Sequence, residues 1–247
     1  MTVISISNHK GGVGKTTSVV NIGAGLAIKG KKVLLIDTDP QANLSQSLGI
    51  EDAEKSIYNA LKKEIPLPIH EIDDNLFLVP SNLDLAVAEV ELSSQISRET
   101  ILRKILEGVK GDFDYIIIDC PPSLGLITIN AFAASDKVII PLQAEYLAMR
   151  GLDKLTDFMA IVQQNVNSGL SLGGVFITQY DSRKVLNRDI SQSVKDAFGE
   201  DKFFKTIIRE NISLAEAPAS NQSIFKYAPK SNGAMDYSDL VTEILNM

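Results

Sequence analysis

Residues 7–17 read SNHKGGVGKTT, and this glycine-rich stretch decides the fold. The apolar run before it, residues 3–6, is typical of a buried strand, and apolar residues three to four apart after it predict a helix. Strand, glycine-rich loop and helix form the arrangement in which a phosphate-binding loop works. Gly11, Gly12 and Gly14 have no side chains, so backbone N–H groups can surround phosphate oxygens beside the positive end of the helix.

The loop follows the phosphate-binding pattern G-x-x-x-x-G-K-[ST] only in its second half. Gly14, Lys15 and Thr16 fit the pattern, whereas His9 stands at the position of its first glycine. In this pattern Lys15 reaches the β- and γ-phosphates, and the Thr16 hydroxyl is a ligand of Mg²⁺. A second lysine, Lys10, lies five residues earlier, where an ordinary phosphate-binding loop needs none. The alternative is a glycine-rich turn that only connects a strand to a helix.

Two continuous apolar runs elsewhere in the chain each end in an acid. Residues 32–37 end in Asp37, with Asp39 two positions further on, and residues 115–119 end in Asp119. Such runs predict central strands of a parallel sheet. Asp119 has the form of the acid that holds Mg²⁺ through a water and accepts a hydrogen bond from the loop threonine. For the other two acids we favour a metal- or water-positioning role, and a purely capping role is the alternative.

The segment KGGVGKTT at residues 10–17 resembles the deviant Walker A motif of the ParA/MinD family of ATPases, and more closely that of the short ParA proteins often called Soj. The resemblance extends from about residue 3 to the C-terminus. DTDPQAN at residues 37–43 resembles the switch I of that family, and PPSLG at residues 121–125 resembles its switch II. By this resemblance, the nucleotide contacts are Lys10, Gly11, Gly12, Val13, Gly14, Lys15, Thr16, Thr17 and, near the adenine, Pro218.

The resemblance also implies roles for individual side chains in ATP hydrolysis. Lys10 would cross to the phosphates of a second subunit in a face-to-face ATP homodimer, Lys15 would act on its own subunit's phosphates, and Asp39 would orient the attacking water. The Mg²⁺ ligands and their neighbours would be Thr16, Asp37 and Asp119. The implied cofactors are therefore ATP and Mg²⁺. ATP is also favoured because the chain has no Asn-Lys pair, with which GTP-binding proteins normally begin their base-reading motif.

Composition limits the classes of protein that remain. The 247 residues are 45% hydrophobic, enough for a sizeable core, and they contain no run of the roughly 18 apolar residues that a membrane span needs. Cys120 is the single cysteine, so no disulfide or iron–sulfur cluster is expected within one chain. The N-terminus lacks the pattern of a secretion signal, and we therefore expect a cytoplasmic protein.

The net charge of −7 and the pI near 4.9 argue against a chain coated for nucleic-acid binding. Residues 183–209, however, hold seven Lys or Arg against four Asp or Glu. The resemblance implies an ATP dimer that binds DNA of the nucleoid without sequence preference, and a ParB-like partner that triggers hydrolysis. We predict DNA contacts from Arg183, Lys184, Arg188 and Arg209. The alternative is that these side chains only solvate helices.

Two other functions are compatible with the loop motif. A MinD-like positioning ATPase would bind anionic lipid, but the helix predicted at residues 236–247 carries Asp236, Asp239 and Glu243, which such lipid repels. A metal-cluster assembly ATPase is disfavoured by the single cysteine. We therefore predict an ATPase switch that partitions or positions a large cargo, such as a plasmid or chromosome, away from the membrane. The MinD-like ATPase is the alternative.

Strand and helix patterns alternate along the whole chain. Strands are expected at residues 3–6, 32–37, 76–79, 115–119, 137–142, 173–178 and 203–208. The acidic stretch 51–75 is expected to be a surface excursion with one short helix at 57–63, and a longer helix is expected at 98–109. This alternation predicts an α/β fold, a single doubly wound, mostly parallel sheet flanked by helices as in P-loop NTPases, with the site at its carboxyl edge. No linker divides the chain, so residues 1–247 are expected to form one domain.

Overall fold

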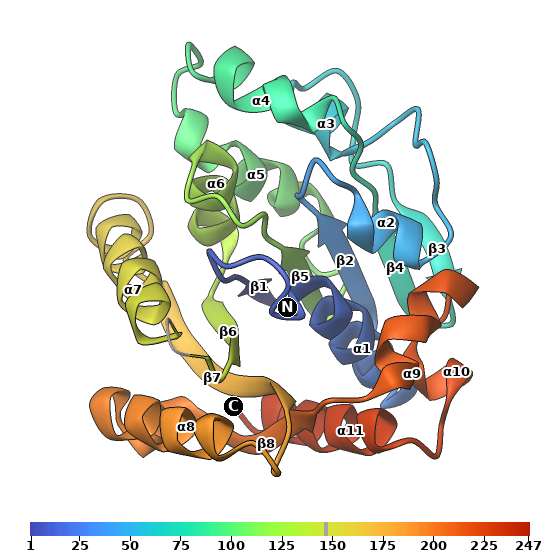
Figure 1. The fold of residues 1–247 in the computed structure, drawn as a ribbon. Helices are drawn as coiled ribbons and strands as arrows, with labels where there is room; N and C mark the ends of the chain where they lie inside the picture. Colours follow the sequence, from blue (N-terminus) through green and yellow to red (C-terminus); the bar gives the residue numbers. More distant parts are fainter. Residues whose placement is uncertain (146–147) are drawn as a thin grey trace.

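The computed structural model describes residues 1–145 and 148–247. An eight-stranded sheet at its centre has the strand order β3-β4-β2-β5-β1-β6-β7-β8, and helices cover both of its faces (Figure 1). The strands are β1 (Thr2–Ile6), β2 (Val33–Asp37), β3 (His70–Asp73), β4 (Leu76–Val79), β5 (Tyr115–Asp119), β6 (Lys137–Gln143), β7 (Ser171–Tyr180) and β8 (Phe203–Arg209). Neighbouring strands run parallel, except that β3 is antiparallel to β4. The predicted doubly wound, mostly parallel sheet is confirmed.

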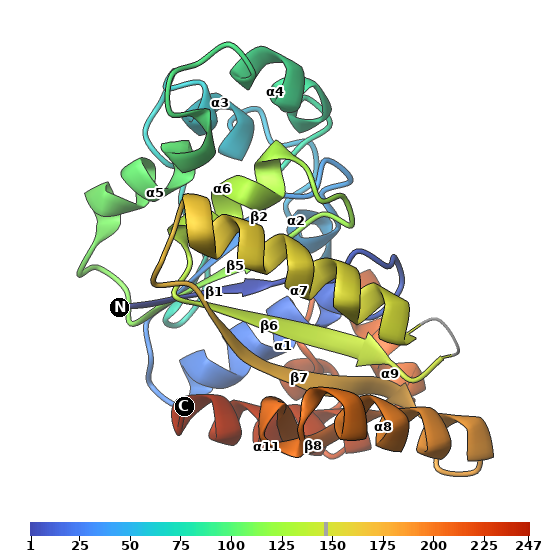
Figure 2. The ribbon, with the colours of Figure 1, turned by 90° about the vertical axis from the view of Figure 1, so that its left-hand side faces the viewer.

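Helices follow most of the strands, as a doubly wound fold requires. The α-helices are α1 (Lys15–Ile28), α2 (Asn43–Ser47), α3 (Ile57–Leu61), α4 (Leu85–Leu92), α5 (Ile101–Leu106), α6 (Leu126–Ala134), α7 (Ala148–Asn165), α8 (Val185–Phe198), α9 (Ile212–Glu216), α10 (Ile224–Tyr227) and α11 (Asn232–Leu245). Short 3₁₀ helices are η1 (Arg98–Thr100), η2 (Glu107–Val109), η3 (Glu200–Lys202) and η4 (Ala217–Ser220). Figure 2 shows α6 and α7 on one side of the central strands and α1 on the other.

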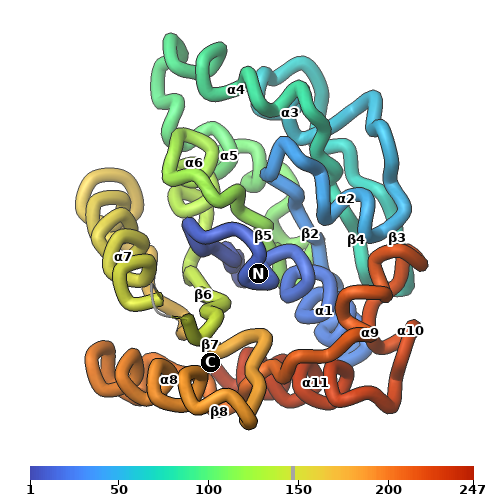
Figure 3. The backbone as a smooth tube through the Cα atoms, in the orientation of Figure 1, coloured from blue at the N-terminus to red at the C-terminus, as the bar shows by residue number. Residues whose placement is uncertain are grey.

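The apolar core lies in two layers, one on each face of the sheet. Ile116 and Ile118 of β5 pack with the cluster under α5, α6 and α7, whereas Ile117 packs with the cluster under α1 and α11. Side chains of a strand alternate between the two faces, so a strand that is apolar at every position must be covered on both. The backbone trace in Figure 3 shows the C-terminal segment passing alongside α1, and α1 and α11 are in contact.

The sheet topology brings the glycine-rich loop and the two strand-end acids to one edge. Ile6, the last residue of β1, is paired with Asp119 of β5, and Asp119 is paired with Asp37 of β2. From β1 the chain first turns to β2 on one side and later returns to β6 on the other side. Such a reversal opens a crevice at the carboxyl ends of the strands, and ligands of open α/β sheets bind there.

Several boundaries differ from the sequence prediction. Within the expected surface excursion, β3 pairs with β4 as an edge strand, and its sequence His-Glu-Ile-Asp, exposed in its first half, carries no apolar run by which to predict it. The helix predicted at 98–109 is divided into η1, α5 and η2. The last helix begins at Asn232, four residues earlier than predicted, because the Ser231 side chain caps it by accepting a hydrogen bond from the backbone N–H of Ala234.

Membrane crossing would require a long helix with few charges. In the part of the chain that the structure describes, residues 1–145 and 148–247, no helix combines the necessary length and apolar character.

Candidate nucleotide site

The glycine-rich loop after β1 owes its shape to backbone conformation. Gly12 and Gly14 have φ values of 76° and 83°, in the left-handed region where a side chain adds strain. A Cβ atom on Gly11 would have no protein atom within 4 Å, and its φ is not in the left-handed region. Neither strain nor packing therefore requires glycine at position 11. Close approach of a ligand to the backbone is the remaining reason for it.

The side chains that follow the loop point back into it. Lys15 is buried, and its Nζ donates a hydrogen bond to the carbonyl oxygen of Lys10 at 3.1 Å. The hydroxyl of Thr16 donates to Oδ2 of Asp119 at 2.7 Å. Burial lowers the pKa of Lys15, and the carboxylates of Asp119 and Asp39 act in the opposite direction. The predicted phosphate lysine and the predicted metal residues are thus brought together.

Asp119 is the residue of this site best suited to contact a cation. Its side chain is buried, and its Oδ1 has no hydrogen-bond partner among residues 1–145 and 148–247. Burial and then the nearby charge of Asp37 raise the pKa of Asp119 well above its usual range. A buried oxygen without a partner is costly unless a ligand or ion satisfies it. Together with the Thr16 hydroxyl, this oxygen fits Mg²⁺, which typically combines one or two protein oxygens with water and phosphate oxygens.

Both carboxylate oxygens of Asp37 already accept hydrogen bonds from the protein, which the predicted metal role did not lead us to expect. Its Oδ2 accepts from the backbone N–H and the hydroxyl of Ser45 at 2.9 and 2.7 Å, and its Oδ1 accepts from the N–H of Asp39 at 3.1 Å. Burial raises the pKa of Asp37 to about 6. In this structure Asp37 anchors the start of α2, and its place near Mg²⁺ stays a prediction. Asp39 is half-buried and accepts from the N–H of Gln41 at 2.9 Å.

No group of three or more His, Cys, Asp or Glu side chains suited to a metal ion occurs within residues 1–145 and 148–247. A metal at Thr16 and Asp119 would therefore depend on oxygen atoms from a phosphate ligand. Because the protein supplies so few oxygen ligands, this site would bind Mg²⁺ only together with a nucleotide.

Lys10, the additional lysine, is paired with a residue outside the phosphate loop. Its Nζ forms an ion pair with the carboxylate of Glu145, on the connection between β6 and α7, and both side chains are about half exposed. The neighbouring Asn8 fixes the backbone here, because its Oδ1 accepts from the N–H of Lys10 while its Nδ2 donates to the carbonyl oxygen of Pro141. Lys10 is accessible from outside, as a role toward a second subunit would need, and that role stays a prediction.

The ends of β7 and β8 form a pocket beside the loop. It measures about 380 Å³ and includes loop residues Gly14 and Thr17. The remaining lining residues are Thr178, Gln179, Ile208, Arg209, Glu210, Asn211, Ile212, Leu214, Ala215 and Tyr237. The position next to the loop suits the base and sugar of a nucleotide. Pro218, which we predicted near the adenine, lies in η4 and does not line this pocket, and its role stays a prediction.

Apart from Gly14, Thr17 and Arg209, the sequence reasoning named none of these pocket residues as site residues, although a general signal for them existed. Ligands of open α/β sheets gather at the carboxyl ends of strands, and β7 and β8 both end here. Gln179 is the most informative of them: its side-chain amide donates to the carbonyl oxygen of Gly12 at 2.6 Å, and its Oε1 accepts from Gln143 at 3.0 Å. Its φ of 50° is left-handed, which is unusual for this residue type. Thr178 adds a second bond to the loop, to the carbonyl oxygen of Val13 at 2.9 Å.

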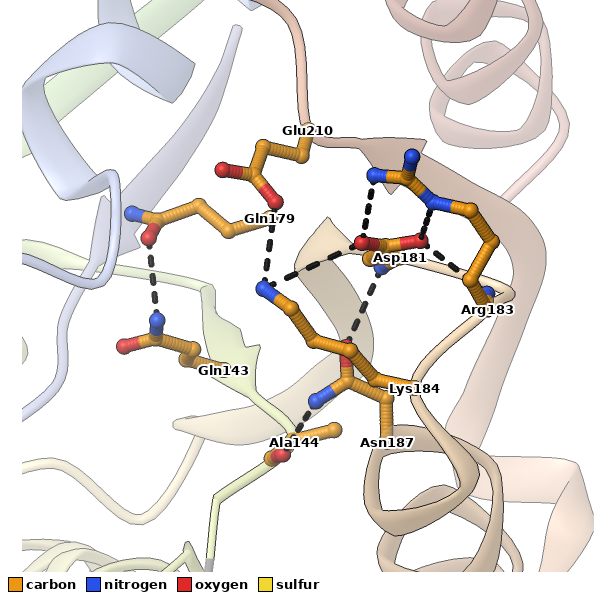
Figure 4. A network of polar contacts seen from close by, with 8 residues as sticks. All are labelled: Gln143, Ala144, Gln179, Asp181, Arg183, Lys184, Asn187 and Glu210. Atoms are coloured by element: carbon orange, nitrogen blue, oxygen red, sulfur yellow. Dashed lines mark hydrogen bonds and ion pairs between the residues drawn. The ribbon is translucent and has the colours of Figure 1, made fainter.

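The four predicted DNA-contacting residues lie near one another, and each of them is paired with an acid. Arg183 binds Asp181 through two of its nitrogens, each at 2.9 Å, and Lys184 lies 3.3 Å from Glu210 and 4.0 Å from Asp181 (Figure 4). The bonds from Arg183 lower the pKa of Asp181 to about 2. Arg188 has a looser partner in its neighbour Asp189, 3.9 Å away.

Arg209 is bound most firmly of the four. It donates from its side chain to both oxygens of Asp236 on α11, with a shortest distance of 2.6 Å, and Asp236 is buried. Arg209 and Arg183 line one hollow of about 580 Å³. Each of the four cations has an acid within 4.0 Å, so DNA phosphates would have to displace these acids, and the predicted DNA contacts stay a prediction.

The comparisons with known proteins agree with the loop motif. A family model described as an AAA domain matches residues 1–172. The sporulation initiation inhibitor protein Soj of Bacillus subtilis is 47% identical, covering 98% of this chain and 97% of that protein. The chromosome-partitioning ATPase Soj of Treponema pallidum is 45% identical, covering 96% and 94%. A solved structure described as cobyrinic acid a,c-diamide synthase from Mycobacterium smegmatis, with bound ADP and magnesium, is 37% identical with a TM-score of 0.88, covering 100% and 95%.

Proposed function

Because this chain belongs to the Soj/ParA family of ATPases, we propose that its loop at residues 10–17 binds ATP with Mg²⁺ and that hydrolysis switches the chain between two states of association. The observation that carries the proposal is the Thr16–Asp119 contact at 2.7 Å with the unpartnered Oδ1 of Asp119 beside it. The similar Mycobacterium smegmatis structure holds ADP and magnesium, which supports the same ligands here. We further propose that residues 1–247 act as one domain.

Each side chain of the site has a part in the proposed reaction. Lys15 exchanges its bond to the carbonyl oxygen of Lys10 for the phosphates, and the left-handed Gly12 and Gly14 hold backbone N–H groups toward them. Thr16 and Asp119 hold Mg²⁺, which when bound neutralises charge on the phosphate oxygens. The 380 Å³ pocket takes the adenosine part.

Asp39 is the proposed water-positioning residue. It follows β2 at the same sheet edge, and its charge acts on Lys15, so the two side chains share one site. Asp37 has a supporting role in this scheme, since its bonds to Ser45 and to the N–H of Asp39 hold the segment on which Asp39 lies.

Lys10 is the residue that would link hydrolysis to homodimer formation. In the single chain it is paired with Glu145 at an exposed position, and exposed pairs contribute at most about 1 kcal/mol. Such a weak partner is easily exchanged for the phosphates on a second subunit. A cation supplied from outside in this way raises hydrolysis by about 10³–10⁵-fold in P-loop enzymes.

We propose that the ATP dimer binds DNA without sequence preference and that a ParB-like protein triggers hydrolysis and release, so that a plasmid, a chromosome or another large cargo is positioned in the cytoplasm over the nucleoid. The acid partners of Arg183, Lys184 and Arg188 lower the affinity expected of one chain, because DNA must displace them. Arg183, Lys184 and Arg188 nevertheless have exposed side chains, at 87%, 56% and 68%. Two copies on a dimer would double the contacts with phosphate.

The MinD-like alternative is disfavoured by the packing of α11. Its apolar residues Leu240, Val241 and Ile244 are buried in the core, and the helix packs against α1 and β8. Its acid Glu243 accepts hydrogen bonds from the backbone N–H groups of Lys205 and Thr206. A helix that lies on lipid needs a free apolar face and basic flanks, and α11 offers neither.

Amide synthesis, the activity by which the Mycobacterium smegmatis structure is described, is a second candidate to weigh. Glutamine-dependent amide synthesis normally uses a nucleophilic cysteine to release ammonia, and a nucleophilic cysteine needs access and a lowered pKa. Cys120, the single cysteine, is wholly buried, and burial raises its pKa to about 12. The site therefore supports the ATPase switch better.

Light scattering of the purified chain with ATP and Mg²⁺, with ADP and Mg²⁺, and without nucleotide tests the proposal. We expect a mass of two chains only with ATP and Mg²⁺, together with slow phosphate release. A chain that stays monomeric with a non-hydrolysable ATP analogue, while it binds that analogue, would overturn the dimer switch and leave only the nucleotide site.

A further inference from the structure

Helix α4 is apolar except for Glu89 and Glu91, and only one of its sides is covered. Leu85, Ala88 and Leu92 are buried in the core. On the opposite side Leu83, just before the helix, is 72% exposed, and Val87 and Val90 are 50% and 76% exposed. Ala86 is also exposed. Apolar side chains gathered on the exposed side of a helix are unusual, and an exposed apolar cluster of this kind marks an interaction site.

These four residues form a single surface, which we call the α4 stripe: Leu83, Ala86, Val87 and Val90. Their spacings of three and four residues place them on one side of the helix. Figures 1 and 2 both show α4 at the outer end of the molecule, far from α8 and α11. The stripe is therefore accessible, and it is separate from the proposed DNA-contacting residues of α8.

Most of the charges around the α4 stripe are acidic, and Arg98, whose guanidinium donates to the carbonyl oxygen of Ser93 at the end of α4, is paired with its neighbour Glu99. Residues 82–97 include Asp84, Glu89 and Glu91 and no Lys or Arg. Lys62 offsets one of them in part, since its Nζ lies 3.6 Å from Glu91. A second copy of this chain would bring the same acids against these, as a two-fold interface pairs like surfaces. An apolar stripe with an acidic border instead complements an apolar face with a basic border.

We propose that the α4 stripe is the docking surface for a basic amphipathic helix of a partner protein. Helices bind one another through apolar residues at three- and four-residue spacing, and charged borders select the partner. The apolar side chains of the partner helix pack between Leu83, Val87 and Val90. Its lysines or arginines pair with Asp84 and Glu89 at the borders.

Glu89 places this surface in contact with the proposed nucleotide switch. Its Oε1 accepts from the backbone N–H of Ile127 at 3.4 Å, and a Cβ on Gly125 would lie 2.1 Å from the same oxygen. Residues 121–125 directly follow β5 and Asp119. A partner that pulls Glu89 outward would therefore act on this segment, although this second step, unlike docking itself, rests on the proposed function.

A defined peptide tests the docking surface. The chain contains no tryptophan, so one tryptophan on the apolar face of a 16-residue Leu/Lys helix would report on the peptide alone. We expect saturable binding without nucleotide, a blue shift of the tryptophan emission as that face is buried, and loss of affinity at high salt. A peptide with Glu in place of Lys is the charge control and should bind at least tenfold more weakly.

Two variants locate the binding. The double variant Val87→Ser/Val90→Ser removes apolar contact without changing charge. It should lower the affinity for the peptide at least tenfold. Ile161→Ser, at a 59% exposed position on α7, is the matched control and should bind as the wild type does. Thermal unfolding of both variants checks that they fold. Equal affinity in wild type and the double variant would overturn the proposal, as would equal binding of the acidic peptide or no binding at all.

Two further measurements separate the remaining outcomes. Sedimentation of the chain alone tests the second copy as occupant: self-association that is lost in Val87→Ser/Val90→Ser would overturn the partner helix. ATP hydrolysis with and without the peptide tests the link to residues 121–125 separately, so that an inactive nucleotide site does not affect the conclusion on docking.

Discussion

Lys10 and Glu145, 135 residues apart in the chain, form an ion pair beside the phosphate loop. The pair allows the role of the lysine to be separated from that of the contact. Lys10→Ala removes both, whereas Glu145→Gln breaks the pair and leaves the lysine. We expect Lys10→Ala to bind ATP normally but to lose dimerisation and to hydrolyse ATP about 10³-fold more slowly, the effect of losing a transferred cation.

Glu145→Gln should retain dimerisation and hydrolysis, because an exposed pair contributes at most about 1 kcal/mol. Fluorescent nucleotide binding, light scattering and phosphate release measure the three properties. Equal loss of hydrolysis in both variants would show that the contact, and not the lysine, is what matters. Lys15→Ala serves as the comparison that should weaken ATP binding itself.

Substitutions of Asp39 and of Asp119 should block different steps, hydrolysis in the first case and Mg²⁺ binding in the second. Asp39→Ala should bind ATP and Mg²⁺ and accumulate as an unhydrolysed dimer, since water positioning is needed only for the chemical step. Asp119→Asn removes the charge from the buried oxygens beside Thr16, and the affinity for ATP should then no longer respond to Mg²⁺. Titration of ATP with and without EDTA distinguishes them. Equal loss of affinity in both variants would refute the division of roles.

Gln179 holds the phosphate loop from a left-handed backbone conformation with φ 50°. Gln179→Ala loses the bond to Gly12 but keeps the strained backbone, whereas Gln179→Gly loses the same bond and relieves the strain. The glycine variant should therefore be more stable than the alanine variant by about 1 kcal/mol, which is about 2–4 °C in Tm for a chain of this size. Both should bind ATP more weakly than wild type. Equal Tm values for the two variants would contradict the assigned strain.

His9 should make the stability of the fold depend on pH. Its ring packs against Gly151, and its Nδ1 is buried with no hydrogen-bond partner in the part of the chain that the structure describes. Burial, and then the charges of Lys154 and Lys15, lower the pKa of His9. The unfolded chain, with an ordinary pKa near 6.5, then takes up a proton at higher pH than the folded chain does. Stability should therefore be complete above about pH 6.5 and decline as the pH falls below it.

His9→Gln cannot take up that proton, so the decline in Tm between pH 7 and pH 5.5 should be smaller in this variant than in wild type. The other histidine, His70, lies exposed on β3, and His70→Gln is the matched control that should change the decline little. If His9→Gln shows the same decline in Tm with falling pH as wild type, His9 is not the cause of that decline.

Local patterns predicted the parts of this structure that depend on neighbours in sequence. The strand, loop and helix around Lys15 and the acid at the end of β5 follow from periodicity and a short motif. The bond between Arg209 and Asp236 joins residues 27 positions apart on different elements, and no local pattern specifies it. The pocket beside the loop shows the same limit, because it depends on where β7 and β8 end in space. The place of Pro218 near the adenine rests on the resemblance and stays a prediction.

The bond to Asp236 also decides how DNA binding should be tested. Arg209→Glu would place a second negative charge beside the buried Asp236, so lost DNA binding could reflect damage to the fold. Arg183 and Arg188 are better choices, because their side chains are 87% and 68% exposed and their acid partners lie nearby in sequence. We expect Arg209→Gln to lower the Tm by several degrees, as removing one partner of a buried pair costs about 3–5 kcal/mol, less where the pair is partly exposed.

The double variant Arg183→Gln/Arg188→Gln should keep ATP-dependent dimerisation and bind every DNA sequence more weakly by a similar factor. If each arginine contacts one phosphate, the slope of log affinity against log salt should fall by about 1 for each residue removed per chain. Lys29→Gln, on the opposite end of α1 from the loop, is the matched charge control and should leave the slope unchanged. Anisotropy of a labelled duplex at several salt concentrations provides the measurement. If the wild-type ATP dimer binds no DNA even at low salt, the proposal that it binds the nucleoid is wrong. The acid partners of these arginines would then bind them more strongly than DNA phosphates do.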